Sequence, residues 1–339
     1  MRILFIKLKH IGDALLLTPT LAATRKRYPE ASIWVVVRKG CDGILEGCPA
    51  IDRLLTAVPP EPDKRSLLYW LPDVGLIREL RRQRFDYAFE LSDGDRGRWI
   101  SYLSRARNRC ASKPAQPLNW WWRRQFTFIS GFDWPKRHRV EKDFFTVNDT
   151  LPLGDEIPPL VFEQTATKPS GLPVRPGAYA LLHPGTRWQR KRWPAEKWIE
   201  LGQFLLAHVP QLVISVGPDR EETELAAILR AAFGAKAIST EGKLSWAQLA
   251  GLLYQARLFV GVDTAAMHLA AACECPTVAI FGPSLVDQWR PWQVPNQVVT
   301  PPSLARQSVP EERLTEAVEV HDVQQACKAM LLAASQDHS

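Results

Sequence analysis

Gly12 and Asp13 are the first residues in the chain that could take part in catalysis. They follow the run Arg2–Leu8, whose apolar residues are typical of a buried strand, and they open a predicted helix. A carboxylate at this position can serve as the general base that deprotonates an attacking hydroxyl group, and one such base is sufficient for an inverting single displacement. The structural alternative is that Asp13 only stabilises the first turn of its helix through the helix dipole.

The segment Arg257–Ser284 predicts a strand, a polar turn, a helix and a second strand within a short stretch. We expect Asp263 to be the N-cap of that helix. Free N–H groups and the helix dipole then favour a diphosphate near Thr264 and Ala265, at the carboxyl end of the preceding strand. The alternative is a helix that is merely capped and closely packed. His268, one turn further on, either reaches the same ligand or packs in the core.

A cationic loop follows another predicted strand, Tyr179–Leu182, which comes earlier in the chain. Lys191 can neutralise a diphosphate that leaves during catalysis, and either Thr186 or Arg187 can contact it. The alternative is that these residues belong to a solvated basic turn.

Glu221 follows a third strand, at a position from which a carboxylate can hold both hydroxyl groups of a ribose. Glu222 and Glu224 are close enough to compete for that role, and first-turn acids are common on any helix. We expect Leu244 to flank the adenine of the same nucleotide.

The composition is that of a globular protein of 339 residues, with 46% hydrophobic and 23% charged residues. No segment approaches the ~20 apolar residues of a membrane span, and Lys7 and Lys9 interrupt any secretory h-region. We therefore expect a cytoplasmic location. The six cysteines show no zinc spacing and are expected to be reduced.

The stretch from Arg96 to Arg139 has eleven Lys or Arg residues, one acid and five tryptophans. Such a surface, with Arg123 and Arg124 beside three tryptophans, suits a phosphorylated glycolipid at a membrane. The same composition also suits nucleic acid. A third interpretation is a solvated basic face with some tryptophans in the core.

Several signatures are absent from the sequence. It has no GxGxxG, GxxxxGK[ST] or GxSxG, which argues against dinucleotide oxidoreductases, P-loop enzymes and elbow-type hydrolases. Asp93-Gly94-Asp95 could suggest a metal site, but two carboxylates in a loop are more often solvated. We predict no metal.

Strands and helices alternate twice along the chain, with a proline-rich passage at 151–178 between the two series. This order predicts an α/β fold with two doubly wound, parallel-sheet domains. The expected boundaries are residues 1–165, 166–315, and a C-terminal helix in 316–339.

Three ordered stretches resemble the glycosyltransferase family 9 enzymes, the ADP-heptose:lipopolysaccharide heptosyltransferases. They are RILFIKLKHIGDALLLTPTL at the start, HPGTRWQRKRWPAEKWIEL at 183–201, and GVDTAAMHLAAA followed by FGPS. The WRPW at 289–292 is similar to the heptosyltransferase III branch.

The resemblance implies a GT-B fold, with two Rossmann-like domains facing a cleft. It implies an inverting, metal-independent transfer of heptose from ADP-heptose, as donor substrate and without a cofactor, to a heptose of the lipopolysaccharide inner core. Asp13 is then the base, Lys191 stabilises the leaving group, and the N-terminal domain, with Gly12, Arg123 and Arg124, takes the acceptor. The enzyme would act at the cytoplasmic face of the inner membrane as a peripheral protein. The alternative is a protein that binds nucleic acid or anionic lipid through residues 96–139 on a GT-B-like frame.

Overall fold

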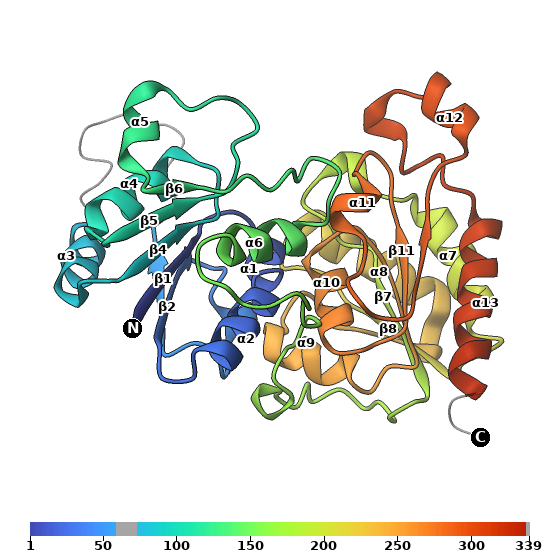
Figure 1. Cartoon of the computed structure of the whole chain (residues 1–339). Helices are drawn as coiled ribbons and strands as arrows, with labels where there is room; N and C mark the ends of the chain where they lie inside the picture. The colour runs from blue at the N-terminus through green and yellow to red at the C-terminus, as the bar shows by residue number, and fades with distance from the viewer. Residues whose placement is uncertain (59–72, 337–339) are drawn as a thin grey trace. The chain divides into compact units, whose positions relative to one another are not determined.

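The computed structural model describes residues 1–58 and 73–336, and it divides into two compact units, Met1–Pro159 and Leu160–Ser339 (Figure 1). We expected a boundary near residue 165, and the contacts place it at Pro159. The C-terminal helix expected in 316–339 is α13 (Val320–Gln336), which packs into the core of the second unit.

The first unit is built on a six-stranded sheet in which every pair of neighbouring strands is parallel. The strand order is β3-β2-β1-β4-β5-β6, so the chain reverses its direction of winding between β1 and β4. The strands are β1 (Arg2–Lys7), β2 (Ser32–Arg38), β3 (Arg53–Ala57), β4 (Tyr87–Glu90), β5 (Asn108–Ala111) and β6 (Phe128–Ile129).

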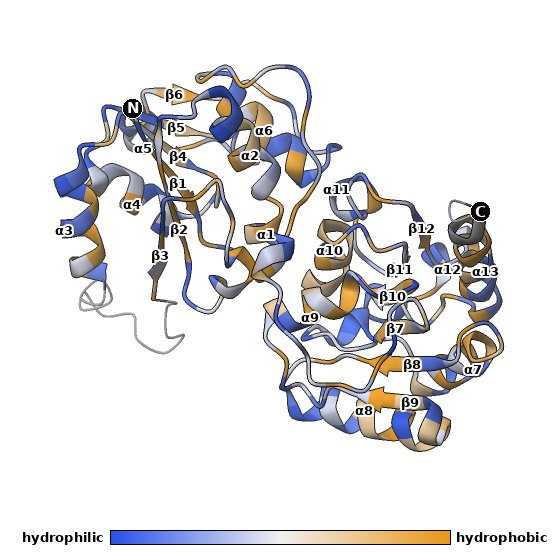
Figure 2. Ribbon diagram, turned by 90° about the horizontal axis from the view of Figure 1, so that it is seen from below, coloured by the Kyte–Doolittle hydropathy of each residue, from blue (hydrophilic) through white to orange (hydrophobic). Residues whose placement is uncertain are grey.

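Helices cover both faces of this sheet, as expected for a doubly wound fold (Figures 1 and 2). Leu4 and Ile6 of β1 pack towards α3 and α4, while α1, α2 and α6 lie on the opposite face. The helices are α1 (Ile11–Leu15), α2 (Thr18–Arg27), α3 (Val74–Gln83), α4 (Asp95–Ser104), α5 (Trp120–Gln125) and α6 (Arg139–Asn148), with a 3₁₀ turn at Gly43–Leu45.

The single helix that we expected from the Asp13 region to Arg27 is two helices. Pro19 lies in the first turn of α2, where its missing N–H costs nothing, and the chain turns at Leu16 and Leu17. The proline therefore starts a new helix and does not kink an existing one.

The second unit repeats the same strand order, β12-β11-β10-β7-β8-β9, again with parallel neighbours. Its direction of winding reverses between β7 and β10. The strands are β7 (Tyr179–His183), β8 (Gln211–Ile214), β9 (Ala237–Ser239), β10 (Leu258–Val262), β11 (Thr277–Ile280) and β12 (Asn296–Val299).

The main core of the second unit lies between the sheet and helices α7, α8 and α13. Figure 2 shows the apolar colour concentrated on strands such as β8 and β9. The helices are α7 (Ala195–Leu205), α8 (Arg220–Phe233), α9 (Trp246–Leu253), α10 (Ala265–Ala272), α11 (Val286–Trp289), α12 (Ser303–Ser308) and α13. The sequence did not indicate helix α12.

The two doubly wound units confirm the predicted α/β class. Within residues 1–58 and 73–336, no helix has the length and apolar character needed to cross a bilayer.

Candidate active site

In open α/β sheets, ligands bind beyond the carboxyl ends of the strands, where the direction of winding reverses. In the second unit this point lies between β7 and β10. The loop after β7 carries Thr186, Arg187 and Lys191, and the loop after β10 carries Asp263 and Thr264. The fold therefore brings two of the sequence-predicted segments, which are about 75 residues apart, to one position.

Lys191 and Asp263 make the contact that joins these loops. The Lys191 ammonium donates to Asp263 Oδ2 at 2.6 Å and to the Asp263 carbonyl oxygen at 3.3 Å. Both side chains are largely covered. Lys191 is thus held at the strand ends and is not part of a freely solvated turn.

The N-cap of α10 is Thr264 and not Asp263, which corrects our expectation. Thr264 has the extended backbone that suits an N-cap, whereas the Asp263 carboxylate is turned away to Lys191. The Thr264 hydroxyl is buried and has no hydrogen-bond partner among the described residues. A buried hydroxyl without a partner at a helix N-terminus is suited to an anionic ligand, because Ala265 begins a helix whose first N–H groups lack intrahelical acceptors.

A cavity of about 490 Å³ opens beyond the end of β7. It is lined by residues that follow β7, by the start of α7, by the first turns of α8 and by Glu316. Its polar members are Thr186, Arg192, Glu221, Glu222 and Glu316. This volume is within the usual range for small-molecule sites. Lys191, Leu244 and residues 263–268 are not among the described residues that line this cavity.

Glu221 and Glu222, in the first turn of α8, have different environments. Glu221 is exposed and pairs with Arg192. Glu222 turns inward, accepts a hydrogen bond from the Gly217 N–H at 2.8 Å, and fills the space beside Gly185. A Cβ on Gly185 would clash with Glu222 Oε2. Burial raises the pKa of Glu222, with a further contribution from Asp219.

The remaining predicted donor residues lie around this region. The Thr186 hydroxyl accepts from the Trp188 N–H at 3.2 Å, and Arg187 is exposed over the Trp188 ring. Leu244 lies in the loop between β9 and α9 and is half-buried. His268 is buried one turn into α10, with its ring centroid 6.4 Å from that of Trp289.

In the first unit, the equivalent point lies between β1 and β4, and Asp13 is there. Asp13 is buried in the first turn of α1, and its Oδ2 accepts a hydrogen bond from the His10 N–H at 3.2 Å. Gly12 precedes it on the same turn. The structure therefore places a carboxylate at a strand-end position, as the sequence predicted.

Asp93 and Asp95 do not form the solvated pair that we expected. Asp93 pairs with Lys142 and Lys9 and accepts from Ser112, whereas Asp95 is 75% exposed and pairs with Arg98 in its own helix. The two carboxylates therefore do not converge. Among the described residues, no group of three or more potential metal ligands was found.

Several side chains of the basic stretch 96–139 pack within the fold, whereas the composition of this stretch suggested a surface that binds a ligand. Trp99, Trp121 and Trp122 form a cluster with centroid separations of 4.6–5.3 Å, and Trp134 is buried. Trp120, by contrast, is 71% exposed. Arg96, Arg98, Lys113 and Arg137 of this stretch form ion pairs with described residues.

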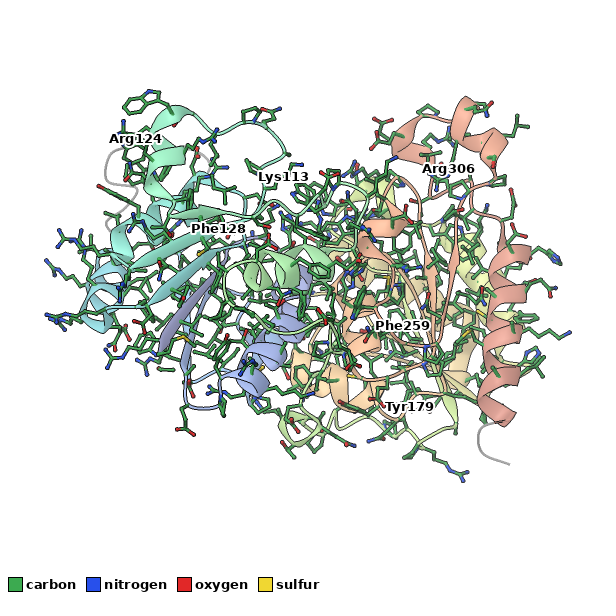
Figure 3. The ribbon with its side chains drawn as sticks, viewed as in Figure 1. Lys113, Arg124, Phe128, Tyr179, Phe259 and Arg306 are labelled. Atoms are coloured by element: carbon green, nitrogen blue, oxygen red, sulfur yellow. The ribbon has the colours of Figure 1, made fainter. Side chains whose placement is uncertain are left out.

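Arg123 and Arg124 are exposed on α5 and make no ion pair with any described residue; Figure 3 shows Arg124 on the outer side of that helix. Together with Trp120 they form one face of α5, which we call the α5 face.

A model of glycosyltransferase family 9 (heptosyltransferase) matches residues 74–318 of the chain. This chain belongs to glycosyltransferase family 9. It is therefore a glycosyltransferase, and the nucleic-acid-binding alternative is not favoured.

The relatives agree with this assignment. Lipopolysaccharide heptosyltransferase 3 of Escherichia coli is 27% identical over 296 residues, which cover 83% of each chain. A glycosyltransferase family 9 structure from Veillonella parvula superposes with a TM-score of 0.81 at 20% identity, over 98% of this chain and 97% of that one. The E. coli heptosyltransferase WaaC with ADP-2-deoxy-2-fluoro heptose gives 0.80 at 20% identity, over 97% and 99%. The GT-B fold and the resemblance to the heptosyltransferase III branch are thus confirmed.

Sequence reasoning named Glu222 only as a competitor of Glu221. The local signal was present, because Asp219 caps α8 and makes Glu222 its N3 residue, whose side chain commonly turns back over the helix start. No local signal of this kind indicated that Asp93 pairs with Lys142 of α6.

Proposed function

We propose that this glycosyltransferase transfers heptose from ADP-heptose to a heptose of the lipopolysaccharide inner core. The observation that carries the proposal is the buried, unpartnered hydroxyl of Thr264 at the start of α10, beside the Lys191–Asp263 pair. Relatives of this chain are named lipopolysaccharide heptosyltransferases, and one solved relative is described with an ADP-heptose analogue.

The donor is held by the second unit. The diphosphate lies against the Thr264 hydroxyl and the N–H groups at Thr264 and Ala265, with Lys191 supplying positive charge. The cavity beside it receives the nucleoside, with Glu222 as the carboxylate for the ribose hydroxyls and Glu221 as the competing residue. Leu244 flanks the adenine, Thr186 or Arg187 contacts phosphate, and His268 supports the α10 end.

The reaction is a single displacement. The acceptor hydroxyl attacks the anomeric carbon of the heptose while the bond from that carbon to the diphosphate oxygen breaks, and the hydroxyl proton passes to Asp13. ADP leaves with the negative charge, which Lys191 and the start of α10 stabilise. Because these groups compensate the charge, the reaction requires neither metal nor cofactor; EDTA should leave turnover unchanged.

The acceptor is held by the first unit, with Gly12 beside the base. The α5 face is the part of this unit that meets the anionic membrane surface, because Trp120, Arg123 and Arg124 have the i, i+3, i+4 spacing of one helix face. Tryptophan favours the headgroup region, and each cation near an anionic surface contributes about 1 kcal/mol. The enzyme then works at the cytoplasmic side of the inner membrane as a peripheral protein.

The decisive experiment incubates the enzyme with ADP-heptose and a defined truncated core acceptor, and identifies the new linkage by mass spectrometry and NMR. Calorimetry with ADP tests the donor site separately. Saturable ADP binding without heptose transfer would refute the proposed acceptor. The absence of a saturable heat of ADP binding would refute the proposed donor site.

A further inference from the structure

The loop that carries Asp13 is bound on one side by the segment after β4. The Leu8 N–H donates to Ser92 Oγ at 2.8 Å, and the Ser92 hydroxyl in turn donates to the Ile6 carbonyl at 3.2 Å. One residue further on in each segment, the Lys9 ammonium lies 3.4 Å from Asp93 Oδ2. These contacts involve Leu8 and Lys9, which lie between the end of β1 and His10. The His10 N–H in turn donates to Asp13.

Asp93 is itself held from three directions. Its backbone is left-handed, with a φ of 56°, a conformation that Asp tolerates better than most residues. The Ser112 hydroxyl, after β5, donates to Asp93 Oδ1 at 2.6 Å, and the Lys142 ammonium, from α6, donates to Oδ2. Burial opposes the charge, but Lys142 and Ser112 outweigh it and hold the pKa of Asp93 well below its usual range.

Helix α6 also holds the start of the same loop. Asp143, next to Lys142, accepts from the Lys7 ammonium with both carboxylate oxygens, at 2.6 and 2.9 Å. Lys7 and Asp143 are both buried, and Lys7 is the last residue of β1. Burial disfavours the charge on Lys7, yet Asp143 and Asp13 outweigh it and raise the pKa of Lys7.

We propose that Asp93 is a positioning residue for Asp13: fixed by Lys142 and Ser112, it holds Lys9 and so the loop that presents the base. This inference rests on the proposed function. A buried ion network is no more stable than well-packed apolar side chains, so stability alone does not account for four charged groups gathered around this loop. A base that must meet the acceptor hydroxyl in a defined geometry does account for them, since a displacement of about 1 Å can cost roughly a hundredfold in rate.

Asp93 and Asp95 provide a matched comparison, because both belong to one Asp-Gly-Asp motif. Asp93→Asn removes the charge that holds Lys9 and should lower kcat about tenfold or more, with the acceptor KM and the ADP Kd unchanged. Asp95→Asn changes an exposed carboxylate whose partner among the described residues is Arg98 of the same helix, and it should leave all three constants unaltered. Equal losses in the two variants, or wild-type kcat in folded Asp93→Asn, would overturn the proposal.

Asp93→Asn also leaves Lys142 without its buried partner, and the variant could fail to fold. Lys9→Met avoids this problem, because Lys9 is 38% exposed and its loss leaves the Lys142–Asp93 pair intact. We expect Lys9→Met to lower kcat about tenfold and Lys9→Arg to recover most of it. Wild-type kcat in Lys9→Met refutes the proposal, as does a rise in acceptor KM with unchanged kcat, which would make Lys9 an acceptor ligand.

Asp13→Asn in the same assay separates this inference from the function on which it rests. If Asp13→Asn turns over at the wild-type rate, the base assignment fails. If Asp13→Asn is inactive while Lys9→Met and folded Asp93→Asn are normal, only the positioning role fails.

Discussion

The Lys191 ammonium binds Asp263 twice, at 2.6 Å through the carboxylate and at 3.3 Å through the carbonyl oxygen. Asp263 directly precedes the N-cap of α10, so the mobile side chain of a lysine is fixed relative to a helix N-terminus. Two sources of positive potential thus lie side by side, so in the proposed donor site neither has to be assembled when the diphosphate binds.

Lys191→Ala should therefore weaken ADP binding and slow turnover together, because the ammonium meets charge in both the ground state and the transition state. Calorimetry with ADP and steady-state kinetics measure the two effects. Arg190→Ala is the matched control, since Arg190 is exposed and pairs with the surface residue Glu311. An unchanged ADP Kd and rate in Lys191→Ala would return Lys191 to a purely structural role.

Glu222→Gln should weaken ADP binding more than Glu221→Gln does. Glu222 faces the cavity from beside Gly185, whereas Glu221 is engaged by Arg192 at the rim. The loss should be about tenfold or more for Glu222→Gln, in line with the loss of a charge-assisted hydrogen bond worth ~1.5–3 kcal/mol. A larger loss in Glu221→Gln would instead support our original sequence assignment of the ribose contact.

Asp13→Asn should lower kcat about 10²–10⁴-fold and leave the ADP Kd nearly intact, because a general base acts in the transition state and not on the nucleotide. Single-turnover kinetics and ADP calorimetry test the two halves of this prediction. Retention of more than about a third of wild-type kcat would exclude the base role.

Because of Glu90, the free energy of unfolding should fall as the pH rises from about 4.5 to about 7. Burial raises the pKa of Glu90 to about 7, with a smaller contribution from Asp93, so in this window the folded state retains a proton that the unfolded chain has released. The loss levels off above pH 7 and amounts to about 3 kcal/mol at most.

Glu90→Gln removes this titration and can still accept from the Ser92 N–H. Relative to wild type, the variant should gain stability from pH 4.5 to 7 and show no further gain above pH 7, as measured by urea unfolding across pH. Glu79→Gln, on the surface of α3, is the control. A stability difference that is independent of pH would contradict the prediction.

Charge reversal of the α5 face, Arg123→Glu with Arg124→Glu, should raise the acceptor KM and flatten its dependence on salt, with the ADP Kd unchanged. The reason is that the attraction is electrostatic and weakens as the Debye length falls from ~10 Å at 0.1 M to ~3 Å at 1 M salt. Kinetics over that range, accompanied by a thermal melt, provide the measurement.

The matched control for the α5 face is Arg78→Glu with Arg82→Glu, which makes the same change of net charge on exposed positions of α3. If both double variants behave alike, the effect is one of net charge and the α5 face has no special role. Wild-type acceptor KM at low salt in the α5 variant would make this face a solvated surface.

The sequence predicted the long apolar strands and the helices between them well, because a buried parallel strand has a continuous apolar run. It missed β5, β6, β9 and β12, which are short and partly exposed, and short helices such as α12. Asp263 was assigned as the N-cap because Asp and Thr are both acceptable caps, and only the position of Lys191 decides between them.

The environment of Asp93 could not be predicted locally. Its main partner, Lys142, is 49 residues away in the sequence and belongs to a helix on a different part of the sheet. Long-range ion pairs leave no periodic trace in a single sequence, and a carboxylate between Ser92 and Gly94 has the pattern of a solvated loop.

The repeated strand order of the two units also bears on how the substrate range of this enzyme can evolve. Each unit has its own sheet, its own core and its own reversal point, and the proposed donor contacts all come from one of them. If the first unit holds the acceptor, as proposed, sequence change confined to that unit can redirect the enzyme to a different acceptor without rebuilding nucleotide recognition.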